Sequence, residues 1–348
     1  MAEPRKIGWE TKIAGTKSAL LPTRTNRSKP LVAGDSVFAS IFSPGAVCAA
    51  KRTTGEILWF VKFDSLGSGS VILQGRNLYA NSNRTLYALD PKTGRARWTF
   101  SPISDNGEWI YSSPSVRGKR VFIGDRCGYF HCLDAVTGKT LWRRLTSMGK
   151  NNQVNSTALA LRDRVITANN QGVVVCYAIE TGKTMWRRKL DGPCVIELLR
   201  YGSKVIVATD SLYAIKLSSG AIDGTWTFPL QTVKSVEVVD FRIALVLGTD
   251  FVSQPAAWNK ASAFNGDLVI LEGGQEVART KLKGTPTIRA SKENGHLYCV
   301  SPWGMQVIDP AGASILSFQQ RQIGAPAISE GQLYGLTEEG ALFSEPVP

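Results

Sequence analysis

The chain has 348 residues, of which 43% are hydrophobic and 20% are charged, and its formal net charge is +13. This balance is that of a soluble globular protein and excludes a disordered or fibrous chain. No stretch reaches the roughly 18 consecutive apolar residues of a membrane-spanning helix, and residues 1–6 contain no apolar signal core, so we expect no membrane association. If the chain is complete, a cytoplasmic location follows; if an export signal has been removed, it does not.

A hexapeptide that begins with Thr-Gly and ends with Trp recurs along the chain. Its copies are residues 54–59, 93–98, 137–142 and 181–186, with a looser fifth copy that ends at Trp226. The tryptophans that end the first four copies are 39 to 44 residues apart, which is the spacing of a structural repeat. A short apolar run precedes each copy and predicts a strand, and the glycine supplies a hairpin turn because it accepts a positive φ.

A second turn, followed by two apolar residues, occurs eight times and therefore predicts eight units. These turns are residues 34–38, 75–79, 118–122, 162–166, 202–206, 240–243, 295–298 and 331–334. Each unit of roughly 40 residues reads as a four-stranded antiparallel meander, as in a β-propeller blade. The chain is thus predicted to be all-β, an eight-bladed β-propeller that forms a single domain over residues 1–348.

The later units are degenerate, and the last one is incomplete. Ala278 and Phe318 stand where the other units have Trp. The last unit, about residues 322–345, has only three predicted strands. A strand at about residues 5–13, which contains Trp9, lacks a blade of its own. We expect this first strand to complete the last blade and close the ring, which removes two open sheet edges.

The pattern Leu-Asp-x-x-Thr-Gly-x-x-x-Trp resembles the quinoprotein alcohol dehydrogenase-like (PQQ-like) propeller repeat. That family includes eight-bladed alcohol dehydrogenases and the non-catalytic outer-membrane-protein assembly propeller BamB. The resemblance implies that Trp59, Trp98, Trp142 and Trp186 dock between adjacent blades. It also implies that a quinone-dependent enzyme would carry a disulfide between adjacent cysteines and a calcium site of Glu, Asn and Asp. No two cysteines here are adjacent and no such set is found, so we expect neither cofactor nor metal.

The six cysteines and His131 read as structural residues. Cys132 and Cys176 share a position in the repeat that is Ala in other units, so buried thiols are expected, with a disulfide or metal role as the alternative. His131 stands where other units have Tyr87 and Tyr213. Neither pattern predicts histidine catalysis.

Basic residues gather between Lys139 and Lys189, where ten Lys and Arg face only Asp163 and Glu180. One interpretation is a solvated blade edge that resists strand pairing. The other is a surface that attracts an anionic ligand or an acidic partner.

Ligands are expected at one face of the propeller, where the loops between blades meet the loops between second and third strands. An insertion at residues 250–260 enlarges this face, and loops on a rigid scaffold commonly carry function. The candidate binding residues are Arg24, Arg27, Arg84, Trp109, Asn152, Gln153, Asn155, Asn170, Trp258, Trp303 and Arg321.

The predicted function is a monomeric, non-catalytic scaffold that binds a protein or another ligand through this polar and aromatic face and through the basic residues between Lys139 and Lys189, here called the basic sector. An alternative is a lyase or isomerase that acts on an anionic small molecule or saccharide in the central funnel. In that enzyme Asp105 or Glu108 would be the acid or base and Tyr111 the proton donor. A second alternative is nucleic-acid binding, although no RNA-binding signature supports it.

Overall fold

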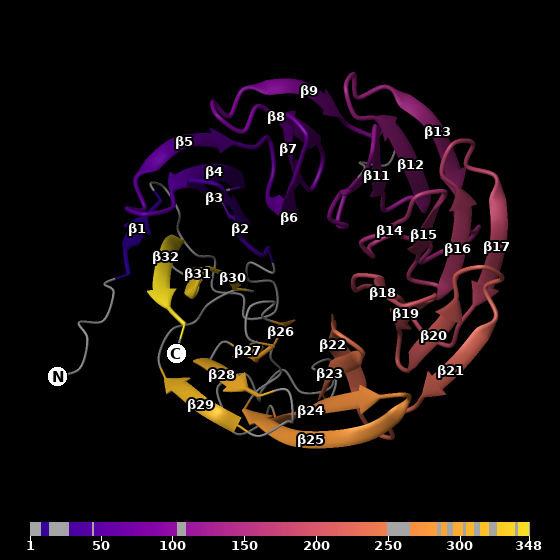
Figure 1. Cartoon of the computed structure of the whole chain (residues 1–348). Coiled ribbons are helices and arrows are strands. Elements are labelled where there is room, and N and C mark those ends of the chain that lie inside the picture. Colours follow the sequence, from indigo (N-terminus) through magenta and orange to yellow (C-terminus); the bar gives the residue numbers. More distant parts are fainter. Residues whose placement is uncertain are drawn as a thin grey trace. The chain divides into compact units, whose positions relative to one another are not determined.

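The computed structural model describes residues 8–13, 28–43, 45–102, 109–248, 265–283, 287–290, 295–301, 304–309, 314–319, 326–337 and 340–347. Every regular element in these ranges is a strand, and the strands form eight four-stranded antiparallel sheets (Figure 1). These sheets are the blades of the eight-bladed β-propeller that the sequence predicts. Within the described ranges, no helix has the length and apolar character needed to cross a membrane.

The chain divides into two compact units of four blades each. One unit spans residues 63–233; the other joins residues 1–62 to residues 234–348. In the first of these, blade 2 consists of β6 (Gly67–Gln74), β7 (Asn77–Ser82), β8 (Leu86–Leu89) and β9 (Ala96–Phe100). Blade 3 consists of β10 (Ser115–Arg117), β11 (Arg120–Gly124), β12 (Tyr129–Asp134) and β13 (Thr140–Leu145). Blade 4 consists of β14 (Leu159–Ala160), β15 (Arg164–Ala168), β16 (Val173–Ala178) and β17 (Thr184–Lys189). Blade 5 consists of β18 (Leu199–Tyr201), β19 (Lys204–Ala208), β20 (Leu212–Lys216) and β21 (Ile222–Trp226).

The other unit contains the first blade and the last three. Blade 1 consists of β2 (Leu31–Ala33), β3 (Ser36–Ile41), β4 (Ala46–Lys51) and β5 (Ile57–Lys62). Blade 6 consists of β22 (Thr232–Val239), β23 (Arg242–Gly248), β24 (Asn265–Glu272) and β25 (Gln275–Lys283). Blade 7 consists of β26 (Thr287–Ala290), β27 (Leu297–Ser301), β28 (Gly304–Ile308) and β29 (Ser314–Gln319). Blade 8 consists of β30 (Ala327–Ser329), β31 (Gln332–Leu336), β32 (Ala341–Pro346) and β1 (Glu10–Lys12).

The two middle strands of a blade are buried on both faces, whereas the outer strand is half exposed. In blade 4 the first five residues of β16 are buried, while in β17 only Trp186 is buried among exposed and half-buried side chains. Middle strands therefore read as continuous apolar runs, because neighbouring blades cover both of their faces. The outer strands alternate, because one of their faces meets water.

The tryptophans of unit 63–233 dock on the next blade in one repeated geometry. The Nε1 of Trp98 donates to the carbonyl of Ala135 at 3.1 Å, and that of Trp142 donates to Ile179 at 3.1 Å. Trp186 donates to Leu217 at 2.9 Å. The three indole rings lie on the turn glycines of the following blades, Gly138, Gly182 and Gly220. The predicted docking between adjacent blades is therefore confirmed for these three tryptophans.

The first strand of the chain completes the last blade, as the sequence predicts. β1 pairs with β32, with Glu10 opposite Phe343 and Lys12 opposite Ala341. Trp9, just before β1, donates its Nε1 to the carbonyl of Arg52 at 2.7 Å and lies on Gly55. Trp9 thus repeats the geometry of Trp98 and ties blade 8 to blade 1.

The strand register corrects two assignments in the degenerate blades. In blade 3, Trp142 pairs with Cys132 next to a β-bulge. The equivalent position in blade 5 is Gly224, which pairs with Ala214, so Trp226 lies two residues beyond the repeat position.

In blade 7 the equivalent residue is Leu316, which pairs with Val307, so the assignment of Phe318 to this position was wrong. A shift of two residues keeps a side chain on the same face of a strand, which is why the apolar pattern did not reveal either error. Ala278 does occupy the Trp position of blade 6, opposite Ile270.

Candidate functional site

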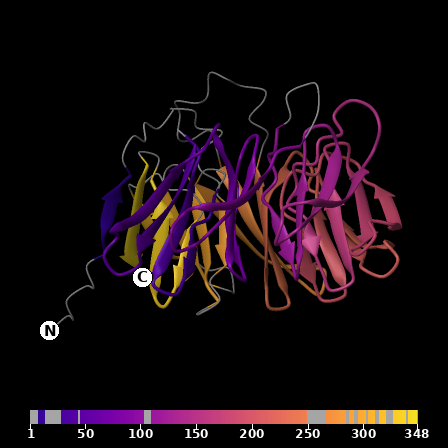
Figure 2. The ribbon, with the colours of Figure 1, turned by 90° about the horizontal axis from the view of Figure 1, so that it is seen from above.

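The loop face of unit 63–233 is the edge where the blade-to-blade loops lie. It comprises the described loop residues 63–66, 109–114, 146–158, 190–198 and 227–231 together with the loops 83–85, 125–128, 169–172 and 209–211. Antiparallel meanders place both sets of loops at the same end of the strands, and Figure 2 shows the strands of this unit from the side, between loops above and turns below. The candidate residues of this unit that the structure describes all belong to this face.

Carboxylates fasten the blade-to-blade loops to the blades that follow. Asp64 accepts hydrogen bonds from the hydroxyls of Ser82 at 2.7 Å, Thr85 at 2.8 Å and Tyr87 at 3.0 Å. Partial burial opposes its ionisation, but these three donors outweigh burial and hold the pKa of Asp64 below its usual value. Asp64 is therefore an ionised structural anchor at neutral pH.

Blade 5 repeats this arrangement with Asp191. Its carboxylate accepts hydrogen bonds from Thr209 at 2.6 Å and from Ser211 at 2.9 Å. As at Asp64, burial opposes ionisation, and the hydrogen bonds from Thr209, Ser211 and Tyr213 nevertheless hold the pKa of Asp191 below its usual value. Tyr87 and Tyr213 thus hold equivalent positions and equivalent roles.

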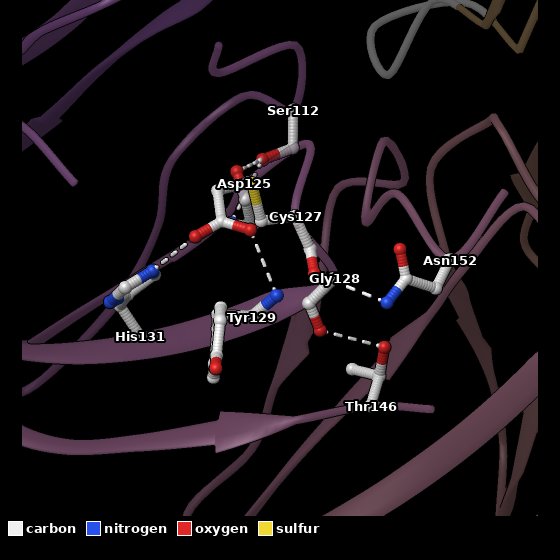
Figure 3. Close-up of polar contacts among 9 residues, drawn as sticks. Ser112, Asp125, Cys127, Gly128, Tyr129, His131, Thr146 and Asn152 are labelled. Carbon is white, nitrogen blue, oxygen red and sulfur yellow. Dashed lines mark hydrogen bonds and ion pairs between the residues drawn. The ribbon is translucent and has the colours of Figure 1, made fainter. Parts of the chain in front are cut away.

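Blade 3 places the carboxylate on the loop between the second and third strands instead (Figure 3). Asp125 accepts from the backbone N–H of Tyr129 at 2.8 Å and lies 2.7 Å from Nε2 of His131. Both side chains are buried, with exposures of 1% and 3%. His131 thus takes the place of the repeated tyrosine and bonds a buried carboxylate, so solvent cannot reach it for catalysis.

The loop 146–155 is fastened to the same corner of blade 3. Thr146 Oγ1 donates to the carbonyl of Gly128 at 2.9 Å. Asn152 Nδ2 donates to the carbonyls of Cys127 at 3.1 Å and Ser147 at 2.9 Å, and Figure 3 shows it directed at the 125–128 loop. The side chain of Asn152, a predicted ligand contact, is therefore used inside the protein.

Two other predicted contacts, Gln153 and Asn170, pair with each other across neighbouring blades. Asn170 donates its backbone N–H to the Gln153 carbonyl at 2.9 Å, and its Nδ2 lies 3.2 Å from Gln153 Oε1. Among the residues that the structure describes, the buried amide oxygens of Asn170 and of Asn155 have no hydrogen-bond partner. An additional donor at this place would satisfy them.

Trp109 and Tyr111 form an aromatic pair on the loop face. Their ring centroids are 5.9 Å apart, and Tyr111 is exposed. The carbonyl of Trp109 accepts the N–H of Arg126 at 2.9 Å, which fixes the pair beside the 125–128 loop. Arg84 is exposed on the same face. The remaining candidates lie outside the described residues: Arg24, Arg27, Asp105, Glu108, Trp258, Trp303 and Arg321.

The structure shows a row of exposed apolar side chains, of which the sequence interpretation singles out only Tyr111. Each blade-to-blade loop of unit 63–233 presents one, and these residues are Leu66, Tyr111, Met148, Val195 and Leu230. Met148 is 83% exposed and Leu230 is 96% exposed. The sequence does not single these residues out, because the same loops contain other large apolar residues, such as Val154 and Leu198, that are buried.

Part of the basic sector serves the fold. Arg144 donates Nε to the carbonyl of Gly182 at 2.9 Å and Nη2 to that of Thr181 at 2.8 Å. Arg188 repeats the contact one blade later, donating Nη2 to Ser219 at 3.2 Å. These guanidinium groups brace the Thr-Gly turns of the next blade, so their charge does not by itself indicate an anionic ligand.

The cysteines lie within the described residues, and none forms a disulfide. Burial raises the pKa of Cys48, Cys132, Cys176, Cys194 and Cys299 to about 12, so these five thiols stay protonated and unreactive. In the described ranges no group of three His, Cys, Asp or Glu side chains could hold a metal ion.

Comparison with known proteins identifies the family. The family described as outer membrane protein assembly factor BamB matches residues 6–100 and 132–344. The chain belongs to this family. A search of curated proteins finds no match.

Solved structures agree on the fold. BamB from Moraxella catarrhalis superposes with a TM-score of 0.68 at 17% identity, covering 96% of this chain and 97% of that one. Quinohemoprotein alcohol dehydrogenase ADHIIG from Pseudomonas putida HK5 gives a TM-score of 0.76 at 11% identity, covering 100% of this chain and 78% of that one. The computationally designed protein Ika8 gives 0.74 at 14% identity, covering 96% and 98%. At these identities the likeness is one of fold.

Proposed function

We propose that this chain is a non-catalytic scaffold that binds a protein partner through the loop face of residues 63–233. The observation that carries the proposal is the row of exposed apolar side chains, one on each blade-to-blade loop. Apolar groups set among polar ones are typical of protein interfaces, where a few aromatic and aliphatic anchors supply most of the affinity. The name of the family, an outer membrane protein assembly factor, supports a protein partner.

The polar residues of the face suit this role as a rigid frame. Asp64, Asp125 and Asp191 fasten the loops before any partner arrives, so that binding would order few side chains. A saccharide or a nucleic acid would instead require stacking platforms or phosphate-directed cations, and the exposed row offers mainly aliphatic groups.

Site-specific photocrosslinking in the native cells tests the proposal. A crosslinking amino acid at Met148 is expected to give discrete protein adducts, whereas the same group at Val136 gives none. Val136 is a matched control, because it is 67% exposed but lies in a Thr-Gly turn at the opposite edge of blade 3. The double substitution Met148→Ser and Val195→Ser should release the partner captured by the wild type. Equal adducts from Met148 and Val136, or a partner retained by the double variant, would refute the proposal.

A further inference from the structure

A cavity of about 240 Å³ lies in blade 6, on the edge where the hairpin turns lie, and faces blade 7. Its apolar wall includes Val239, Ala244 and Ile270 from blade 6 and Leu297 from blade 7. Ala244, Ile270 and Leu297 are each about 2% exposed. All of these residues belong to one compact unit, and none belongs to the loop face described above.

The repeat explains why this space exists. In each blade, three cross-strand neighbours form a row; in blade 3 they are Phe122, Cys132 and Trp142. The corresponding row in blade 6 is Ala244, Ile270 and Ala278, so two large aromatic side chains are replaced by two methyl groups. Ile270 is larger than Cys132, but one branched aliphatic side chain does not replace two aromatic rings.

Six of the other seven blades keep at least one aromatic residue at this row. Blades 1, 2 and 4 have Trp59, Trp98 and Trp186, and blade 8 has Trp9 beside Ser344. Blade 7 has Tyr298, and in blade 5 the ring of Trp226 lies over Gly224. The row of blade 5, Ile206, Ala214 and Gly224, contains no aromatic residue, but the ring of Trp226 covers it. Among the eight rows compared, all from the described strands, only blade 6 has neither an aromatic residue in the row nor one two positions further along its outer strand.

The cavity has the size and chemistry of an aromatic ring. An apolar cavity of about 150 Å³ holds benzene, so the larger space here accommodates a bicyclic ring. The mouth is polar: Arg242 Nε donates to Glu272 Oε2 at 3.0 Å, and Asp240 lies beside them. The mouth therefore carries one more carboxylate than guanidinium groups, which disfavours an aromatic acid.

From this geometry we infer that blade 6 contains a binding site for an indole-sized, uncharged aromatic ring, in the cavity lined by Ala244 and Ile270 of this row. The ligand replaces contacts that the chain itself supplies in other blades. The site is independent of the proposed protein-binding face.

The test is a titration of the full-length protein with indole, read by thermal shift and by methyl NMR of Ala244, Ile270 and Leu297. Indole is expected to raise the melting temperature in a saturable manner, because it binds only the folded state. The methyl signals of these three residues should move while those of blades 2 to 5 stay in place. Indole-3-carboxylate should bind more weakly than indole.

Ala244→Phe is the decisive variant, because Ala244 lines the cavity and its counterpart in blade 3 is Phe122; the added ring should abolish both responses while keeping or raising the melting temperature. If Ala244→Phe does not fold, Ala244→Leu fills part of the same cavity with a smaller side chain. Absence of any methyl shift at millimolar indole in the wild type would overturn the inference. So would a response that survives in a folded filled variant, or stronger binding of indole-3-carboxylate.

Discussion

The indole ring of Trp98 lies directly on Gly138, so that a Cβ added to this glycine would come within 2.7 Å of the ring. The turn of one blade is thus the docking surface for the outer strand of the preceding blade. Trp142 on Gly182, Trp186 on Gly220 and Trp9 on Gly55 repeat the contact. Two reasons require glycine at these positions: the backbone has a positive φ, and the ring leaves no room for a Cβ.

Gly138→Ala should therefore be more destabilising than Gly118→Ala. Both glycines have a positive φ, 73° and 59°, but a Cβ at Gly118 meets nothing within 4 Å. Backbone strain alone should cost about 1–2 kcal/mol at Gly118. At Gly138 the displaced ring should add about 1–3 kcal/mol. Denaturant unfolding of the two variants measures the difference, and equal costs would show that Trp98 moves aside freely.

Trp142→Ala should lower the free energy of unfolding by about 3–5 kcal/mol, because it leaves a cavity and an unpaired carbonyl at Ile179. Trp109→Ala should change it little, because Trp109 is only half-buried on the loop face. Urea titration of both variants tests this contrast. A comparable loss in the two would mean that Trp109 is part of the core.

Arg144→Ala should destabilise the fold by about 1 kcal/mol, because its guanidinium bonds two backbone carbonyls of the next blade. Arg144→Lys should restore little of the loss, since an ammonium group cannot reproduce the two-pronged contact. Lys139→Ala, an exposed control in the same sector, should be neutral. If all three variants unfold at the same urea concentration as the wild type, the bracing role is wrong.

The pKa values of Asp64 and Asp191 are lower in the folded state than in the unfolded state. Their contribution to the free energy of unfolding is therefore fully present above the unfolded pKa of about 3.9 and is lost as the pH falls through the lower folded pKa. The double substitution Asp64→Asn and Asp191→Asn should therefore flatten the dependence of stability on pH below about pH 5. Each carboxylate is partly exposed, so we expect less than about 1 kcal/mol from each at pH 7. Unfolding measured from pH 3 to pH 7 in wild type and variant isolates this difference; parallel curves would contradict the prediction.

Thiol labelling should distinguish Cys127 from the other five cysteines. Burial raises the pKa of Cys48, Cys132, Cys176, Cys194 and Cys299 to about 12, whereas Cys127 is only partly buried on the loop face. At pH 8 the native protein should react with a thiol reagent at Cys127 alone, and after unfolding at all six positions. Mass spectrometry counts the labelled sites. Labelling of the native protein at more than one cysteine would contradict the prediction and would show that the blades open readily.

The sequence by itself determined the fold, because the determinants of a blade are local. Each Thr-Gly turn and the tryptophan after it specify a hairpin and a docking residue within one short segment. The strand around Trp9 belongs to no blade of its own, so its pairing with the last blade could also be predicted. Candidate loop residues such as Trp109, Tyr111 and Asn152 could also be assigned to one face, since antiparallel strands alternate between two loop edges.

Only the tertiary structure decided what each of these side chains does. Asn152 is consumed by contacts to Cys127 and Ser147, and Arg144 braces a turn, whereas Met148 is left exposed. The β-bulge register showed that Leu316, and not Phe318, holds the repeat position, and the cavity in blade 6 arises from residues about thirty positions apart. Burial, hydrogen-bond partners and empty volume depend on which blades face each other, and no pattern within a single segment contains that information.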